Sequence, residues 1–319
     1  MMPHWWTAAA ITLASFAVVS ALTSVLIGVA GPALTRRTAR YAPAARARLL
    51  FSLCVLPAVF AFWCALGVAL PVFLYFEPPG SDERLARTLI VLATAGAAML
   101  ARGAWRACAS WRATDALMRG WQARGRRLQM ADAPMPVFAI EESFPTVAVV
   151  GFSRPALFIA ERVLRECTAN EVRAMVLHEC AHLTHRDNLK RFLMRACPDA
   201  VQRQSALDRA WTNASEEAAD ARAAGGDRAF ALDLAQALIR VARLAPRVRT
   251  LDLASAFYLG GSIESRVRRL IEPADSLPDP SRPLGWVLAC ATVCLAIGLL
   301  AVAAPTLHQL MEVAVRHLP

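Results

Sequence analysis

Long uninterrupted runs of apolar residues dominate the pattern along this chain. Residues 5–34, 49–76 and 284–307 carry no charged side chain, and each run exceeds the roughly 20 residues that a helix needs to cross the hydrocarbon core of a bilayer. A fourth run, residues 85–104, is weaker because arginines lie near both of its ends and must snorkel to the interfaces. We predict four transmembrane helices, with a buried soluble helix or a re-entrant segment as the alternative for 85–104.

The charges between these runs predict their orientation. Residues 31–48 hold five arginines and no acid, and residues 102–130 hold seven arginines against one aspartate. Positive charge marks the cytoplasmic side of a membrane, while the acidic loop 77–84 suits the outside. We therefore expect both termini outside and the long segment between the third and fourth spans in the cytoplasm. A cleaved signal peptide over the first run is disfavoured, because no basic residue precedes it and the run is too long.

This pattern divides the chain into a membrane part and one cytoplasmic domain. The expected divisions are three spans within residues 1–105, the domain over 106–283, the fourth span at 284–307 and a short tail at 308–319. The first part of the domain is basic and contains Trp105, Trp111 and Trp121. It is either a helix lying on an anionic membrane surface or a connecting helix whose tryptophans pack on the domain.

Inside the domain, the pattern changes to short strands followed by helices. Three segments rich in Val, Ile and Phe predict a small sheet: 136–141, 146–151 and 156–160. Thr168 and Glu171 form a capping box, which predicts a helix from there through Leu183. Further helices are predicted to end at about 196, to run from about 205 to Gly225, and to cover about 228–244 and 262–271. The expected fold class is an α-helical membrane protein with an inserted α+β domain.

Composition narrows the functional classes. A hydrophobic content of 56% is too high for an ordinary soluble enzyme. The net charge of +10 would suit nucleic-acid binding, but the arginines gather beside the predicted spans and no nucleic-acid motif is present. We therefore expect the lipid bilayer, and not nucleic acid, as a partner. The eight cysteines form no CxxC pair or spaced framework, which is typical of a reduced compartment.

One cluster of histidines carries candidate chemistry. Three of the six histidines fall within eight residues, and two of them belong to His178-Glu179-Cys180-Ala181-His182, an HExxH pattern. Because this segment lies in a predicted helix, the i, i+4 spacing puts both imidazoles on one face, where they can hold one zinc ion. Glu179 lies beside them and is the candidate general base, taking a proton from a water that the zinc activates.

A catalytic zinc needs a third protein ligand, and the acidic segment 216–220 offers one. Either Glu216 or Glu217 could coordinate, but only Glu216 has an acid four residues further on. We predict Glu216 as the ligand and Asp220 as the carboxylate that orients a ligand histidine. The alternatives are a solvated acidic helix face and, for His185, a spare ligand or a merely polar residue. One Zn²⁺ per chain is the expected cofactor, because two histidines and a carboxylate favour zinc.

Further segments extend these motifs and carry a resemblance. They are Gly151-Phe152-Ser153-Arg154-Pro155, the stretch from Glu171 through the HExxH pattern to Arg186-Asp187-Asn188, and Glu264-Ser265-Arg266-Val267-Arg268-Arg269-Leu270. Together with four spans and a domain between the third and fourth, they resemble the BlaR/MecR-type membrane zinc metallopeptidases, the sensor-transducer family of beta-lactam resistance. The resemblance covers roughly residues 1–310, with specific motifs only from about 150 to 272.

The resemblance implies a zincin-like fold of the glutamate-ligand (gluzincin) type in a bacterial inner membrane. It implies His178 and His182 as zinc ligands, Glu179 as general base, and Glu216 with Asp220 as the ExxxD element of such peptidases. Members of the family cleave themselves or a cytoplasmic repressor. Their receptors continue after the last span into a large extracellular penicillin-binding domain, whereas this sequence ends at Pro319, so we do not expect direct sensing of beta-lactams.

We therefore expect a membrane-embedded zinc endopeptidase that cleaves cytoplasmic or membrane-proximal proteins in signalling or regulated proteolysis. The substrate backbone is expected to pair with an edge strand of the small sheet. Peptidases of the CAAX prenyl endopeptidase and heat-shock type share the HExxH, RD and ExxxAD features, so a quality-control peptidase is the alternative. A non-catalytic signalling scaffold would not need Glu179, and a transporter would not explain the metal pattern.

Overall fold

The computed structural model describes residues 4–76, 87–198, 206–244, 263–272 and 309. The helices, in chain order, are α1 His4–Thr38, α2 Pro43–Cys64, the π-helical turn η1 Ala65–Ala69, α3 Leu70–Phe76, α4 Arg87–Arg124, α5 Glu161–Glu166, α6 Ala169–His185, α7 Asp187–Ala196, α8 Ala206–Ala224, α9 Arg228–Leu244 and α11 Ile263–Ile271. The strands are β1 Arg126–Leu128, β2 Val137–Ile140, β3 Val147–Val150 and β4 Ala156–Ala160.

Three helical segments are long and apolar enough to cross a membrane: Trp5–Thr38, Pro43–Tyr75 and Arg87–Arg124. They contain the first three predicted spans and are typical of a membrane protein. The described residues thus hold three candidate spans instead of the predicted four, because the run at 284–307 lies outside them.

Each of these helices extends beyond its predicted span. The first continues to Thr38, the second begins at Pro43, and α4 runs without a break to Arg124. Arginine, a strong helix former, recurs in all the added turns and alanine in those of α2 and α4, so the end of an apolar run is not the end of its helix. The basic segment with the three tryptophans is therefore the second half of the third candidate span, and α4 passes through the expected domain boundary at residue 105.

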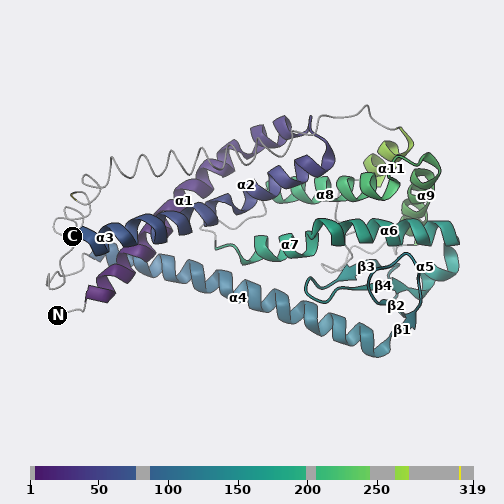
Figure 1. Ribbon diagram of the computed structural model, residues 1–319, viewed down its shortest axis with the longest axis horizontal. Coiled ribbons are helices and arrows are strands. Elements are labelled where there is room, and N and C mark those ends of the chain that lie inside the picture. The colour runs from purple at the N-terminus through teal and green to yellow at the C-terminus, as the bar shows by residue number, and fades with distance from the viewer. Residues whose placement is uncertain (1–3, 77–86, 199–205, 245–262, 273–308, 310–319) are drawn as a thin grey trace.

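The tryptophans of α4 differ in burial. Trp105 and Trp111 are exposed. Trp121 packs on Phe158 of β4 with ring centroids 5.1 Å apart and donates a hydrogen bond to Glu142. The interpretation as a connecting helix therefore holds for Trp121, which attaches α4 to the sheet at the end of the molecule opposite the N-terminus (Figure 1).

The first and third candidate spans make a close contact. A Cβ atom added to Gly96 of α4 would lie 2.2 Å from the carbonyl oxygen of Leu13 in α1. Any side chain larger than hydrogen would therefore push the two backbones apart, so this crossing requires glycine.

The four strands form one mixed sheet in the order β1-β2-β4-β3. The central pair, β2 and β4, is parallel, and the outer pairs are antiparallel. The three predicted strands are confirmed to within one residue at each end. β1 was not predicted, because Arg126-Arg127-Leu128 lacks apolar alternation; it pairs antiparallel with β2. The sheet packs on α6 and α9 through a buried core that includes Leu157, Ile159, Val176, Leu234 and Leu238.

The predicted helix signals of the domain are confirmed. The side chain of Thr168 accepts from the Glu171 amide and the Glu171 carboxylate accepts from the Thr168 amide, so the capping box starts α6. α8 ends at Gly225 and Gly226, both with positive φ. None of the six cysteines among the described residues forms a disulfide.

The arrangement of α8 positions the site next to the membrane part. α8 packs against α2 and against α6, and Leu207 and Trp211 of α8 are buried with Leu50 of α2. Figure 1 shows α8 running beside α2 and leading toward α11 and α9. The helix that carries the predicted third ligand is therefore attached directly to a candidate transmembrane helix.

Candidate metal centre

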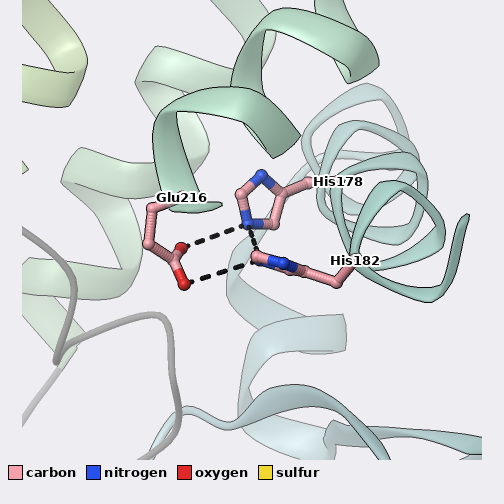
Figure 2. Close-up of side chains that lie close together, drawn as sticks. All are labelled: His178, His182 and Glu216. Carbon is pink, nitrogen blue, oxygen red and sulfur yellow. Dashed lines mark hydrogen bonds and ion pairs between the residues drawn. The ribbon is translucent and has the colours of Figure 1, made fainter. Parts of the chain in front are cut away.

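Two helices bring the three predicted ligands together. His178 and His182 project from the same face of α6, one turn apart, and Glu216 faces them from α8 (Figure 2). The two Nε2 atoms lie 3.2 Å apart. Nε2 of His178 is 3.5 Å from Oε2 of Glu216, and Nε2 of His182 is 3.5 Å from Oε1. These residues are buried and could hold a metal ion.

Carboxylates behind the ligands fix both imidazole rings. Nδ1 of His178 lies 2.9 Å from Oδ1 of Asp220, the acid that the sequence predicted to orient a ligand histidine. Nδ1 of His182 bonds to Oδ2 of Asp187 at 2.8 Å. With each Nδ1 directed at a carboxylate, the Nε2 atoms face Glu216, and this is the orientation in which they can bind a metal ion once deprotonated.

Sequence reasoning missed the position of Asp187. The residue belongs to the Arg186-Asp187-Asn188 motif, but its place depends on a backbone detail. Arg186 ends α6 in a left-handed conformation, φ 55° and ψ 38°, and α7 starts immediately afterwards. This tight reversal places Asp187, five residues after His182 in the sequence, beside the His182 ring.

Glu179 is buried next to the ligands and bound to the sheet. Its Oε2 accepts a hydrogen bond of 2.9 Å from the backbone N–H of Val149 in β3. Its charge contributes to raising the pKa of His182, which places the carboxylate within electrostatic reach of the site. Asn188 donates to the carbonyl oxygen of the same Val149, so both outward-facing backbone groups of that residue are engaged by polar residues of the site.

Two arginines that sequence reasoning did not assign to the site contact Glu216. Nη1 of Arg266, from α11, lies 3.2 Å from Oε2, and Nη2 of Arg191, from α7, donates to Oε1 at 3.4 Å. Arg266 is fully buried and also donates from Nε and Nη2 to Asp220, at 2.8 and 2.7 Å. Arg266 lies in a basic helix whose other charged side chains are exposed. The sequence alone therefore does not distinguish Arg266 from them.

The charges of this group are strongly coupled. Burial lowers the pKa of His182, but the charge of Glu216 and the bond to Asp187 outweigh it and raise the pKa to about 10. The pKa of His178 is likewise raised, because hydrogen bonds to Asp220 and Glu216 overcome the effect of burial. Burial raises the pKa of Asp220, but Arg266 outweighs it and holds the pKa at about 2.

These shifts describe an anionic site that requires positive charge. Burial also raises the pKa of Glu216, yet His182, His178 and Arg266 together hold it well below its usual range. Arg266 and Arg191 supply part of this charge, and the rest can come from protons on the two imidazoles or from a divalent ion. The donor set of two imidazole nitrogens and one carboxylate therefore fits a metal ion in charge as well as in position.

Glu217 and His185, the alternative ligands in the sequence, do not join the three predicted ligands. Glu217 pairs with Arg46 of α2 at 3.4 Å and with Arg269 of α11, away from the histidines. His185 is half-buried one turn beyond His182 and does not belong to the group of described residues that could hold a metal ion. The structure thus brings together His178, His182 and Glu216, with Asp220 behind His178.

Comparison with protein-family models and with curated proteins gives no match. The resemblance to the BlaR/MecR-type peptidases therefore rests on the residues and motifs of the sequence alone.

Proposed function

We propose that this protein is a membrane-embedded, zinc-dependent endopeptidase that cleaves cytoplasmic or membrane-proximal proteins. The proposal is carried by one observation: a buried pair of histidines one helical turn apart, converging with a glutamate from a second helix, with a glutamate next in sequence to the first histidine. Two of the three candidate ligands and the candidate base thus come from one HExxH helix.

The spacing of the two histidine nitrogens is close to that expected in a tetrahedral zinc site. Bonds of about 2.0–2.1 Å in a tetrahedral site separate neighbouring ligand atoms by about 3.3–3.4 Å. The two nitrogens lie 3.2 Å apart, Nε2 of His178 lies 3.5 Å from Oε2 of Glu216, and Nε2 of His182 lies 3.5 Å from Oε1 of the same carboxylate. Two histidines, one glutamate and a position left to water or substrate is the ligand set of several catalytic zinc sites.

Zinc bound here would act as a Lewis acid that polarises the carbonyl of the bond to be cleaved. The protein's own contribution is the transfer of a proton. Glu179 would accept it at a carboxylate oxygen from the attacking water and deliver it to the leaving amine. Asp187 and Asp220 would hold His182 and His178 in position while charge develops.

The outer edge of β3 is the proposed site for substrate backbone. β3 is an edge strand, so an extended peptide can add to it. At Val149, however, the outward N–H and C=O groups already bind Glu179 and Asn188. A peptide pairing at this residue would have to replace both partners. Its binding would therefore release Glu179 from the strand, so that the base becomes free only when substrate is present.

The attachment of the site to the membrane part supports a membrane-proximal substrate. Glu216 lies on the helix that packs on α2, and Arg46 of α2 pairs with the neighbouring Glu217. Together with the arginine-rich segments at the inner ends of the spans, this favours a domain held against the cytoplasmic face of a bacterial inner membrane. A cytoplasmic repressor or the chain itself would be a substrate of this kind, in signalling or regulated proteolysis.

The test is cleavage of an unfolded protein by the purified wild-type chain and by Glu179→Gln, both in detergent with zinc supplied. We expect both to bind about one zinc per chain and only the wild type to cleave. Glu142→Gln, which changes an acid outside the site, is the matched control and should cleave like the wild type. Equal cleavage by Glu179→Gln would overturn the assignment of the base, and a wild type that holds zinc but cleaves nothing would favour a scaffold.

A further inference from the structure

The carboxylate of Glu216 is held at both of its oxygens. Oε2 faces His178 at 3.5 Å and Nη1 of Arg266 at 3.2 Å. Oε1 faces His182 at 3.5 Å and accepts from Nη2 of Arg191 at 3.4 Å. Each oxygen therefore has one imidazole and one guanidinium beside it.

The two arginines are fixed by other contacts. Arg266 is bound through Nε and Nη2 to Asp220, so its remaining Nη1 has a set direction toward Glu216. The guanidinium of Arg191 lies 5.6 Å from the centre of the Trp211 ring, a cation–π contact on the same helix as Glu216. They reach Glu216 from α11 and α7, so the carboxylate is held from two separate elements.

This arrangement bears on how Glu216 would bind an ion. A carboxylate can bind a metal through one oxygen or through both. If both oxygens bound, the second would take the position that a catalytic site leaves open. An oxygen that keeps its guanidinium partner is a weaker donor to a second cation, because its charge is already shared with that partner.

We propose that Arg191 and Arg266 restrict Glu216 to binding the metal through a single oxygen, and thereby keep a coordination position open. This inference rests on the proposed metal site. The two arginines are positioning residues that act through Glu216. If they merely balanced the buried negative charge, replacing them would change stability or affinity and leave the number of metal–ligand bonds unchanged.

Cobalt(II) in place of zinc provides a readout of that number. Cobalt absorbs visible light strongly when four-coordinate and more weakly when five-coordinate. The test compares the cobalt-loaded wild type with Arg191→Met and Arg266→Lys. Methionine removes the charge from a side chain that is 27% exposed, and lysine keeps the charge that Asp220 requires but lacks the guanidinium fork that reaches Asp220 and Glu216 together. Arg268→Met, an exposed arginine on α11 paired with Glu264, is the matched control.

We expect the wild type and Arg268→Met to show the strong band, and both site variants to lose about half or more of its intensity per bound cobalt, as a second oxygen of Glu216 joins the metal. An unchanged band in Arg191→Met, at the same cobalt content, overturns the proposal. If Arg266→Lys does not fold, Arg191→Met decides alone, because it leaves Arg266 to neutralise Asp220. A wild type that binds no cobalt refutes the metal site itself, which is a different failure from an unchanged band.

Discussion

Replacing Asp187 with asparagine should lower the affinity of the site for zinc by about tenfold, the lower end of the usual effect of residues behind metal ligands. The aspartate oxygen lies 2.8 Å from Nδ1 of His182 and is almost fully buried, so water screens its charge little. Asparagine has nearly the same size and keeps an acceptor oxygen. It lacks the negative charge that makes Nε2 of His182 a stronger ligand for the metal ion. A tenfold loss corresponds to about 1.4 kcal/mol of binding free energy.

The assay is competition for zinc between the purified protein and a chromophoric chelator at fixed pH. Asp132→Asn is the matched control, because Asp132 pairs with Arg173 on the exposed side of α6 and should leave the affinity unchanged. Equal zinc affinity in Asp187→Asn and the wild type would refute the role given to Asp187. A loss of folded protein in Asp187→Asn, detected by its circular dichroism, would instead assign the residue to stability.

Three further predictions follow from the contacts described. Glu216→Gln should lose zinc while the neighbouring Glu217→Gln, whose partners are Arg46 and Arg269, keeps it; equal zinc contents by mass spectrometry would contradict this. Zinc affinity should rise with pH by about tenfold per pH unit for each proton that zinc displaces. The pKa of His182 is raised to about 10, so below that pH zinc must displace the proton on this ring. A zinc affinity that does not change between pH 6 and 8 would contradict this prediction. Gly96→Ala should lower stability in detergent by roughly 1–3 kcal/mol, whereas Gly28→Ala, with open space around its Cβ, should not; equal melting temperatures would contradict it.

Local signals predicted most of the secondary structure. The capping box at Thr168 and the paired glycines after Ala224 fix helix ends through hydrogen bonds and backbone conformations that depend on a few neighbouring residues. The ends of the membrane helices were predicted less well, because lipid exposure sets the length of an apolar run while helix propensity sets the length of the helix.

The sequence predicted the residues of the site that share a helix with one another, because helical periodicity places them on one face. The i, i+4 spacing relates His178 to His182 on one helix and Glu216 to Asp220 on another, and Glu179 is recognised from the HExxH pattern. Arg266 lies 88 residues from His178 in sequence, and no local pattern separates it from the exposed arginines of α11. Its role depends on tertiary packing, which a single sequence does not encode as a periodic pattern.

The most direct test of the account is an anomalous-difference map measured on both sides of the zinc absorption edge, from crystals of the wild-type protein grown with zinc. The account predicts one peak per chain, within bonding distance of Nε2 of His178, Nε2 of His182 and a single oxygen of Glu216. A map without a peak between these three side chains, or with the zinc held by other residues, would contradict it.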